Sequence, residues 1–306
     1  MMNALVKLAI TAVLLAPLTN ARAADDARKW KLDKAPEVPA TVRVDRDVAY
    51  LPDDRRELAD LYFPAKVAEG QKLPAVLLMH GGGFNDGDKA CGREVQMAIE
   101  LAKHGYVVMS INYKLWNKGV KNPTWPQSLY DAKTAVRWLR KNADRLKIDP
   151  ERIGAFGNSA GGNLAAMLAL TVAKDGLDPK EPYGEISTGV LCAIDFYGAA
   201  DLPNYHDMKM FLKTREEDPA VYRRASPLTY VRAAAPPLLI VHGTKDETVP
   251  HSQAETLAAA LKKVGAAYQL ELVPDAPHTF FLNSPARDFR PLVFEFLDKH
   301  LKPKKQ

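Results

Sequence analysis

The feature that most limits the possible folds is the alternation of short apolar runs with longer helical patterns. The apolar runs predict strands at 42–50, 57–63, 75–84, 106–113, 153–156, 186–197, 237–242 and 268–273. The helical patterns fall at 95–104, 126–146, 160–173, 252–264 and 290–301. Continuous apolar strands that alternate with helices are typical of a parallel sheet covered on both faces. We therefore expect an α/β fold with a mostly parallel eight-stranded sheet, whose first two strands are antiparallel because a short turn joins them.

The N-terminal residues form a separate segment. Lys7, an apolar run at 8–18 and the sequence Ala21-Arg22-Ala23 predict a signal peptide at 1–23. Cleavage between Ala23 and Ala24 would direct the protein to a secreted or periplasmic location. A buried N-terminal helix is the alternative. The apolar run is shorter than the roughly 20 residues that cross a bilayer, so we expect no membrane span.

The remaining chain is interpreted as one domain. Residues 24–40 are a polar lead-in, and 41–306 form the α/β domain. A segment at about 198–230 is rich in charged and aromatic residues and interrupts the alternation, so it is expected to be an insertion over the carboxyl edge of the sheet.

Composition excludes several classes of protein. Hydrophobic residues make up 47% of the 306 residues and charged residues 26%, as in ordinary globular proteins. The net charge is +5, but the basic residues are scattered apart from the tail at 302–305, so no nucleic-acid partner is indicated. Cys91 lies in a polar loop and Cys192 in an apolar run, which favours two separate thiols, although an exported protein could pair them. No spacing typical of a zinc site is present.

The sequence GNSAG at 157–161 matches the pattern G-x-S-x-G between a predicted strand and a predicted helix. Such a turn is so tight that the residues flanking the serine must be small, and it holds the serine oxygen out over the sheet. Ser159 is therefore a candidate nucleophile at a helix N-terminus. The alternative is a plain or phosphate-binding turn, but the lysine of a P-loop is missing.

A serine nucleophile needs a base and an acid, which follow it in the order Ser, Asp or Glu, His in this architecture. Asp246 follows the strand predicted at 237–242, and His278 follows the next strand. Position alone selects His278 among the histidines. Glu247 and Asp195 remain alternatives for the acid, whereas Asp275 is too close to His278 in sequence to be favoured.

Three consecutive glycines at 81–83 follow the third strand, at the same predicted edge as Ser159. Glycines let backbone N–H groups approach a bound carbonyl oxygen. We expect Gly82, Gly83 and Ala160 to form an oxyanion hole, with an ordinary flexible loop as the alternative. His80 is expected to hold this loop in shape, and His242 to pack at a strand end.

The motifs HGGGF, GNSAGG, HGTKDETVP and PHTFF together resemble those of α/β-hydrolase esterases. The stretches LADLYFPAK and WPQSLYDAKTAVRWLRKNADRLKIDPERIGAFGNSAGGNLAAMLAL are most similar to the branch of bifunctional feruloyl and acetyl-xylan esterases, near the hormone-sensitive-lipase-like carboxylesterases. The resemblance covers 41–300. It implies Ser159, Asp246 and His278 as catalytic residues, an acyl-enzyme mechanism, no cofactor or metal, and a small-molecule or polysaccharide-linked ester as substrate.

The chain departs from these relatives in two ways. The residue before the serine is often acidic in the family but is Asn158 here, which predicts one charge fewer near the site. An N-terminal helical cap is not indicated, which predicts an open site covered mainly by the insertion. Fewer than half of the following side chains are expected to line it: Trp116, Trp125, Tyr205, Met208, Met210, Phe211 and Phe280. A peptidase of the prolyl-oligopeptidase type, a non-catalytic binding module and a lyase that reuses the triad remain alternative functions.

Overall fold

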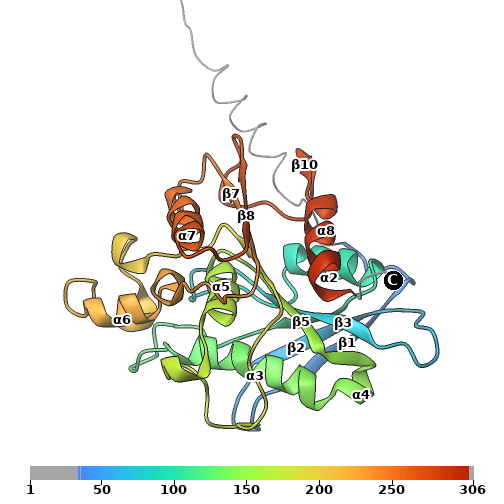
Figure 1. Ribbon diagram of the computed structural model, residues 1–306. Helices are drawn as coiled ribbons and strands as arrows, with labels where there is room; N and C mark the ends of the chain where they lie inside the picture. Colours follow the sequence, from blue (N-terminus) through green and yellow to red (C-terminus); the bar gives the residue numbers. More distant parts are fainter. Residues whose placement is uncertain (1–33, 35, 303–306) are drawn as a thin grey trace, which may run out of the picture.

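The computed structural model describes residue 34 and residues 36–302 (Figure 1). The predicted signal peptide at 1–23, its cleavage position and most of the lead-in lie outside these residues.

The core of the fold is a single eight-stranded sheet with the spatial order β1-β2-β4-β3-β5-β6-β7-β8. Its strands are β1 (Val42–Ala49), β2 (Leu58–Pro64), β3 (Leu73–Met79), β4 (Val107–Ile111), β5 (Ile148–Asn158), β6 (Ala193–Phe196), β7 (Leu238–Gly243) and β8 (Tyr268–Val273). β2 is antiparallel to both β1 and β4, and all the other neighbours are parallel. The predicted fold class and the antiparallel start of the sheet are confirmed.

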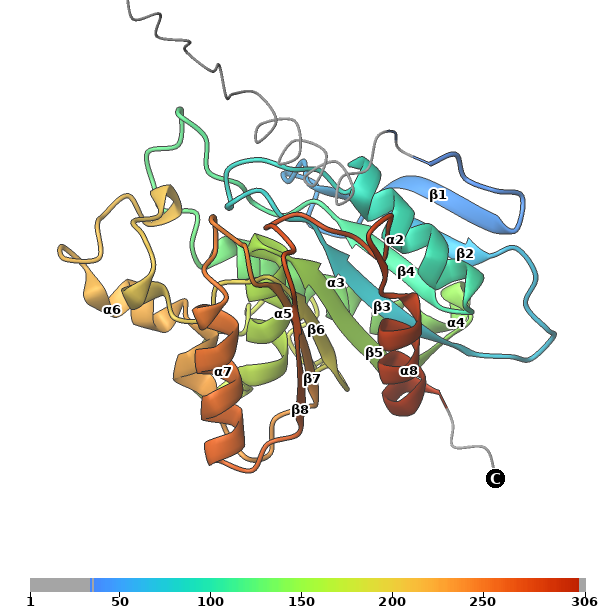
Figure 2. The same ribbon diagram turned by 90° about the horizontal axis from the view of Figure 1, so that it is seen from above.

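Helices cover both faces of this sheet (Figure 2). One face packs against α2 (Gly92–Lys103) and α8 (Arg290–Leu301). The other packs against α3 (Gln127–Lys141), α4 (Ala143–Leu146), α5 (Ala160–Leu170) and α7 (Ser252–Lys263). The central strand β3 shows the consequence for sequence: Leu77 belongs to one apolar core and Leu78 to the other, so both must be apolar.

Two elements differ from the sequence prediction. The helix expected at 126–146 is divided at Asn142, whose side chain and backbone N–H both donate to the carbonyl of Trp138, at 2.8 and 3.0 Å. The strand expected at 186–197 is regular only over β6. The carbonyls of Ile186 and Ser187 accept hydrogen bonds from Arg137 and Arg140 of α3, both at 2.7 Å, so arginine side chains replace a neighbouring strand there.

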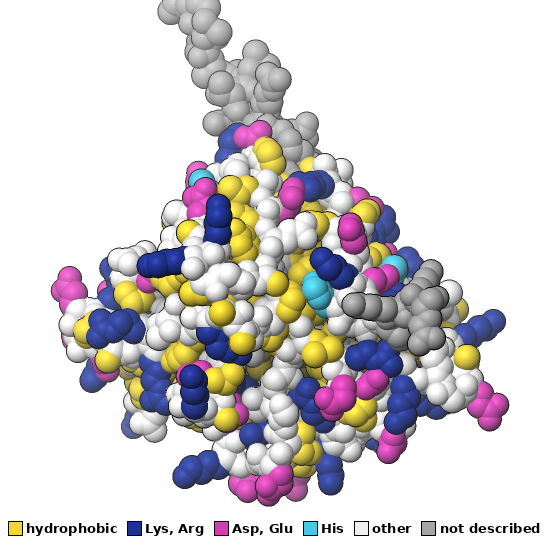
Figure 3. Space-filling model, in the orientation of Figure 1, with side chains coloured by type: hydrophobic (Ala, Val, Ile, Leu, Met, Phe, Trp, Pro, Cys, Tyr) yellow, Lys and Arg dark blue, Asp and Glu magenta, His cyan; other side chains and the backbone are white. Residues whose placement is uncertain are grey.

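The segment 198–230 follows β6 and contains α6 (Pro219–Arg224) and three short 3₁₀ turns. It lies beyond α5 at one side of the molecule in Figures 1 and 2. The Tyr222 hydroxyl donates to the carbonyl of Lys213 and accepts from the Met208 N–H, so one buried side chain ties the segment together. On the face shown in Figure 3, basic and acidic side chains are interspersed.

Candidate active site

Ser159 lies in the turn between β5 and α5, with φ of 54° and ψ of −117°. Side chains other than glycine rarely adopt this backbone conformation, which costs on the order of 1–3 kcal/mol. A Cβ on Gly157 would lie 2.0 Å from the carbonyl oxygen of Gly161, and one on Gly161 would lie 2.1 Å from that of Met79. The Ser159 N–H donates to the carbonyl of Phe196 at 2.8 Å, which fixes the turn to β6. The hydroxyl is thereby held at the carboxyl ends of the strands.

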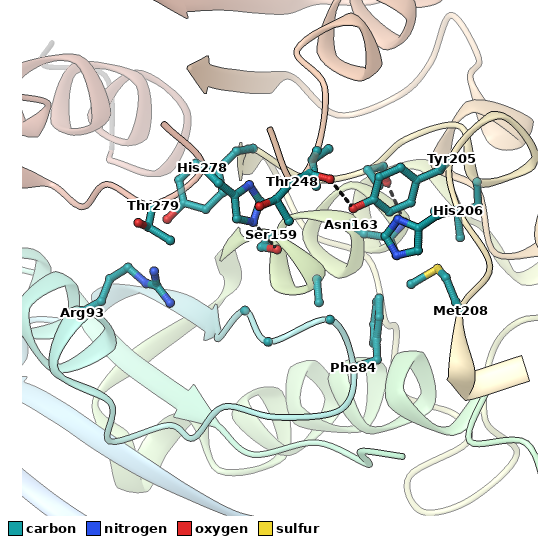
Figure 4. A pocket seen from close by; sticks show the side chains of 18 residues that line it. Phe84, Arg93, Ser159, Asn163, Tyr205, His206, Met208, Thr248, His278 and Thr279 are labelled. Atoms are coloured by element: carbon teal, nitrogen blue, oxygen red, sulfur yellow. Dashed lines mark hydrogen bonds between the residues drawn. The ribbon is translucent and has the colours of Figure 1, made fainter. Parts of the chain in front are cut away.

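The structure brings Ser159, His278 and Asp246 together from three loops (Figure 4). His278 follows β8, and its Nε2 lies 2.9 Å from the Ser159 hydroxyl oxygen. Its Nδ1 lies 2.7 Å from Oδ2 of Asp246, which follows β7. The Asp246 side chain is completely shielded from solvent, whereas the His278 side chain is 16% exposed. The serine and histidine therefore face the pocket, and the carboxylate stands behind them.

The contacts of Asp246 determine where the protons lie. Burial opposes its ionisation, but hydrogen bonds from His242 and His278 outweigh that effect and lower the pKa of Asp246 to about 2. Its Oδ1 also accepts the N–H groups of Thr248 and Val249 at 2.9 and 2.8 Å. An ionised carboxylate only accepts hydrogen bonds, so Nδ1 of His278 must donate and Nε2 is left to accept the Ser159 proton.

His242 is a partner of Asp246 that the sequence prediction missed. It is fully buried at the end of β7, as expected for a packed residue, but its Nε2 lies 3.1 Å from Asp246 Oδ2 and 2.8 Å from the Val249 carbonyl oxygen. Both neighbours are acceptors, so Nε2 carries the proton and donates to them. The spacing of four positions between His242 and Asp246 was the available signal, because it places both at the same strand end.

The alternative acids occupy other positions. Asp195 is buried within β6, where it accepts the N–H of Gly198 at 2.8 Å, and burial raises its pKa to about 6. Asp275 is exposed and forms an ion pair of 2.8 Å with Lys245. Glu247 is exposed on the loop beside Asp246. Among the described residues, Asp246 is the carboxylate that contacts His278.

The glycine loop lies beside Ser159. Gly82 has φ of 119°, and a Cβ there would lie 1.9 Å from the carbonyl oxygen of Asp86, so the loop requires glycine at this position. Within residues 36–302, the N–H groups of Gly82, Gly83 and Ala160 make no backbone hydrogen bond, and all three residues line the pocket. These donors are available to an oxygen bound next to Ser159.

His80 supports this loop from beneath. Its Nδ1 lies 2.6 Å from the carbonyl oxygen of Gly81, and its ring stacks on Tyr113 at a centroid distance of 4.4 Å. The expectation that His80 shapes the loop is confirmed. Among the described residues, no group of three His, Cys, Asp or Glu side chains could hold a metal ion, and no helix is long and apolar enough to cross a membrane.

The pocket above Ser159 has a volume of about 400 Å³. The segment that follows β6 contributes apolar and aromatic side chains to it, including Leu202, Tyr205 and Met208. Of the seven aromatic and methionine candidates named from the sequence, only Tyr205 and Met208 line the pocket, which confirms the expectation of fewer than half. Both cysteines are free thiols, Cys91 exposed and Cys192 buried, as expected.

Tyr197 also lines the pocket and was missed by the sequence analysis. Its hydroxyl donates to the carbonyl of Phe280 at 2.7 Å, and its ring meets that of His278 edge-on at 4.9 Å. It therefore connects the end of β6 to the histidine loop. Its position at the end of the strand predicted at 186–197 was the only signal available.

The comparison of Asn158 with the acidic residue of relatives stays a prediction, but the structure shows an acid next to Asn158. The Asn158 side chain donates to the carboxylate of Glu94 at 2.9 Å, and Glu94 is fully buried. An acidic side chain from α2 therefore lies beside the residue that precedes the serine. Sequence alone could not show this, because Glu94 is 64 residues away from Asn158.

Comparison with known proteins gives the family. The family model BD-FAE matches residues 59–261, which is more than half of the chain. The chain belongs to the BD-FAE family. The resemblance to α/β-hydrolase esterases that the motifs indicated is therefore confirmed.

Individual relatives of this BD-FAE chain agree with that assignment. It is 32% identical to esterase LipQ of Mycobacterium tuberculosis over 85% of its own length and 64% of LipQ, so it spans less than two thirds of that relative. It is 29% identical to the ethyl acetate hydrolase of Pseudomonas putida, over 79% of this chain and 78% of the relative. The solved structure of Thermogutta terrifontis esterase 2 phosphorylated by paraoxon is 28% identical, with a TM-score of 0.72, and the match covers 90% of this chain and all of that one.

Proposed function

We propose that this protein is a serine carboxylesterase that hydrolyses acetyl, short-chain acyl or feruloyl esters. The observation that carries the proposal is the continuous hydrogen-bonded series Ser159, His278 and Asp246, with Ser159 in a strained turn beside free backbone N–H groups. Membership of the BD-FAE family and the esterase and hydrolase relatives support the same reaction class.

The proposed reaction has two halves. Nε2 of His278 accepts the proton of Ser159 while the oxygen attacks the ester carbonyl, and Asp246 stabilises the imidazolium. The N–H groups of Gly82, Gly83 and Ala160 donate to the oxyanion. His278 then protonates the leaving alcohol, and water releases the acyl group from the serine by the same steps.

The nature of the substrate is also a proposal. A pocket of about 400 Å³ that lies open to solvent suits a small ester or the acylated end of a larger molecule, including one linked to a polysaccharide. The predicted signal peptide supports a secreted or periplasmic location, where such polymers are accessible.

The direct test is the variant Ser159→Ala, assayed with p-nitrophenyl acetate. Activity should be abolished while the circular dichroism spectrum stays unchanged, and a fully active variant would refute the assignment. A panel of acetyl, butyryl, octanoyl and feruloyl esters together with acetyl-xylan then defines the substrate. A strong preference for octanoyl esters would contradict the polysaccharide proposal.

A further inference from the structure

Arg93 is a cation in the pocket that the reaction described above does not use. It stands at the start of α2, and its side chain lines the same cavity as Ser159 and His278. In Figure 4 its guanidinium points from α2 into the pocket, below Thr279. Among the described residues that line the cavity, Arg93 is the one permanent charge, and no Asp or Glu lines it.

The hydrogen bonds of Arg93 leave most of its donors available. Its Nε donates to Oε1 of Glu94 at 3.3 Å, and Oε2 of Glu94 has no partner in the described chain. The pair is therefore held by one contact and not by the parallel two-bond geometry that arginine commonly forms with a carboxylate. The two terminal nitrogens, Nη1 and Nη2, make no hydrogen bond to another described residue.

The placement of Glu94 explains why the guanidinium is available to a ligand. Glu94 is fully buried and also accepts a hydrogen bond from Asn158, so it lies beneath the pocket floor and not in the pocket. The Arg93 side chain is 26% exposed and reaches past it into the cavity. The buried carboxylate thus orients the arginine through Nε and leaves the planar end to face the ligand.

The two sides of the pocket differ in the chemistry of the side chains that line them. In Figure 4, Arg93 and Thr279 lie on one side of Ser159. Phe84, Met208, Tyr205 and His206 lie on the other. An ester bound at Ser159 would therefore place one substituent against apolar and aromatic side chains. The other substituent would meet a guanidinium and a hydroxyl, which together favour an oxygen-rich anion.

We propose that Arg93 determines specificity, and that the preferred substrates carry a carboxylate or similar anion on the side of the ester bond that faces α2. This inference rests on the proposed esterase function and specifies its substrate class. The anion could belong to the alcohol or to the acyl group, and the experiment below separates these two cases.

The test uses matched pairs of esters. para-Acetoxybenzoate and its neutral methyl ester place the charge on the alcohol side, and p-nitrophenyl hemisuccinate and p-nitrophenyl butyrate place it on the acyl side. For each pair, the ratio of kcat/KM for the anionic over the neutral ester is measured and divided by the same ratio for alkaline hydrolysis. This ratio is independent of the fraction of folded enzyme, because both esters meet the same sample.

We expect the wild-type enzyme to favour the anionic ester in one of the two pairs, and the preference to weaken at high ionic strength. Arg93→Gln should lower the preference by at least about 10-fold, because a charge-assisted hydrogen bond is lost. Arg93→Lys should retain part of it. Arg145→Gln, which changes an arginine on α4 outside the pocket, should leave it unchanged.

Two outcomes would overturn the proposal: no preference for either anionic ester in the wild-type enzyme, or the same preference in Arg93→Gln as in the wild type. Failure of the underlying function would look different, because the neutral esters would then not be hydrolysed at all. If Arg93→Gln does not fold, the wild-type ratios and Arg93→Lys decide the question.

Discussion

His242 donates a hydrogen bond to Asp246, so replacing His242 should lower the stability of the fold. This prediction can be tested without measuring catalysis. In His242→Phe the ring is retained, but the donor at 3.1 Å from Asp246 Oδ2 and 2.8 Å from the Val249 carbonyl oxygen is removed. Losing a hydrogen bond to a charged group costs about 1.5–3 kcal/mol, and leaving a buried carbonyl unpaired costs about 1–3 kcal/mol. We expect the free energy of unfolding to fall by about 3 kcal/mol.

The same variant should change the response to acid. Asp246 has a pKa of about 2 in the folded protein against an ordinary value of 3.8, a difference that stabilises the fold by about 2 kcal/mol. Because the folded pKa is the lower one, this stabilisation is present above pH 3.8 and is lost as the pH falls towards 2. His242→Phe removes one of the hydrogen bonds that lower the pKa of Asp246, so the midpoint of acid unfolding should move to higher pH.

Urea unfolding at pH 7 and acid unfolding followed by circular dichroism measure the two effects. His242→Gln provides a matched control, because its amide can still donate one hydrogen bond and should recover part of the stability. If His242→Phe matches the wild type in both the urea midpoint and the acid midpoint, the assigned role of His242 is wrong.

The remaining predictions concern the carboxylate, the turn and the buried acid. Asp246→Asn should lower kcat on the order of 10,000-fold in steady-state assays, because an amide stabilises the wrong imidazole tautomer. A loss of less than roughly 10-fold would contradict the role given to Asp246. Gly161→Ala should destabilise the protein by about 3 kcal/mol or more in urea, since its Cβ would meet a backbone carbonyl oxygen at 2.1 Å. Gly119→Ala is the control, because its Cβ would lie 3.4 Å from its nearest neighbour, and equal stability of the two variants would refute the packing argument. Asn158→Asp should place a second carboxyl beside the buried Glu94, which raises the pKa of the introduced group. The stability of this variant should therefore fall as the pH rises from roughly 5 to 8. A loss of stability that does not depend on pH in thermal unfolding would contradict this.

The sequence predicted best those residues of the site that lie in the loops directly after strands. Ser159, Asp246 and His278 each follow a strand that could be predicted from the sequence, and the carboxyl ends of parallel strands meet at one edge of a sheet. Their approach therefore follows from the order of the elements. The glycine loop could be predicted for the same reason, because it follows β3.

The parts that sequence could not predict depend on side-chain direction and on contacts between distant elements. Arg93 and Glu94 are neighbours on α2, yet one faces the pocket and the other lies beneath it. Trp125 and Phe211 were pocket candidates, but they pack edge-on against each other at 6.3 Å, outside the pocket lining. Composition could not separate them from Tyr205, which lines the pocket, because all three are aromatic residues near an insertion or a loop.

The first half of the strand expected at 186–197 also depends on contacts with a distant element. The strand prediction holds only for Ala193–Phe196, and the arginines of α3 that bind the carbonyls of residues 186 and 187 come from about 50 residues earlier. Only the packing of α3 against the sheet brings them there. Local pattern predicts which residues are extended, and tertiary contacts decide which of them pair as strands.

The central claim is that Ser159 is a nucleophile activated by His278, and covalent labelling tests it most directly. The protein is incubated with paraoxon, and intact mass and peptide mapping identify the modified residue while p-nitrophenyl acetate hydrolysis is followed. We predict one diethylphosphoryl group per chain, located on Ser159, with activity lost in proportion to labelling and no labelling of Ser159→Ala. An enzyme that hydrolyses esters while Ser159 stays unmodified and dispensable would contradict the account.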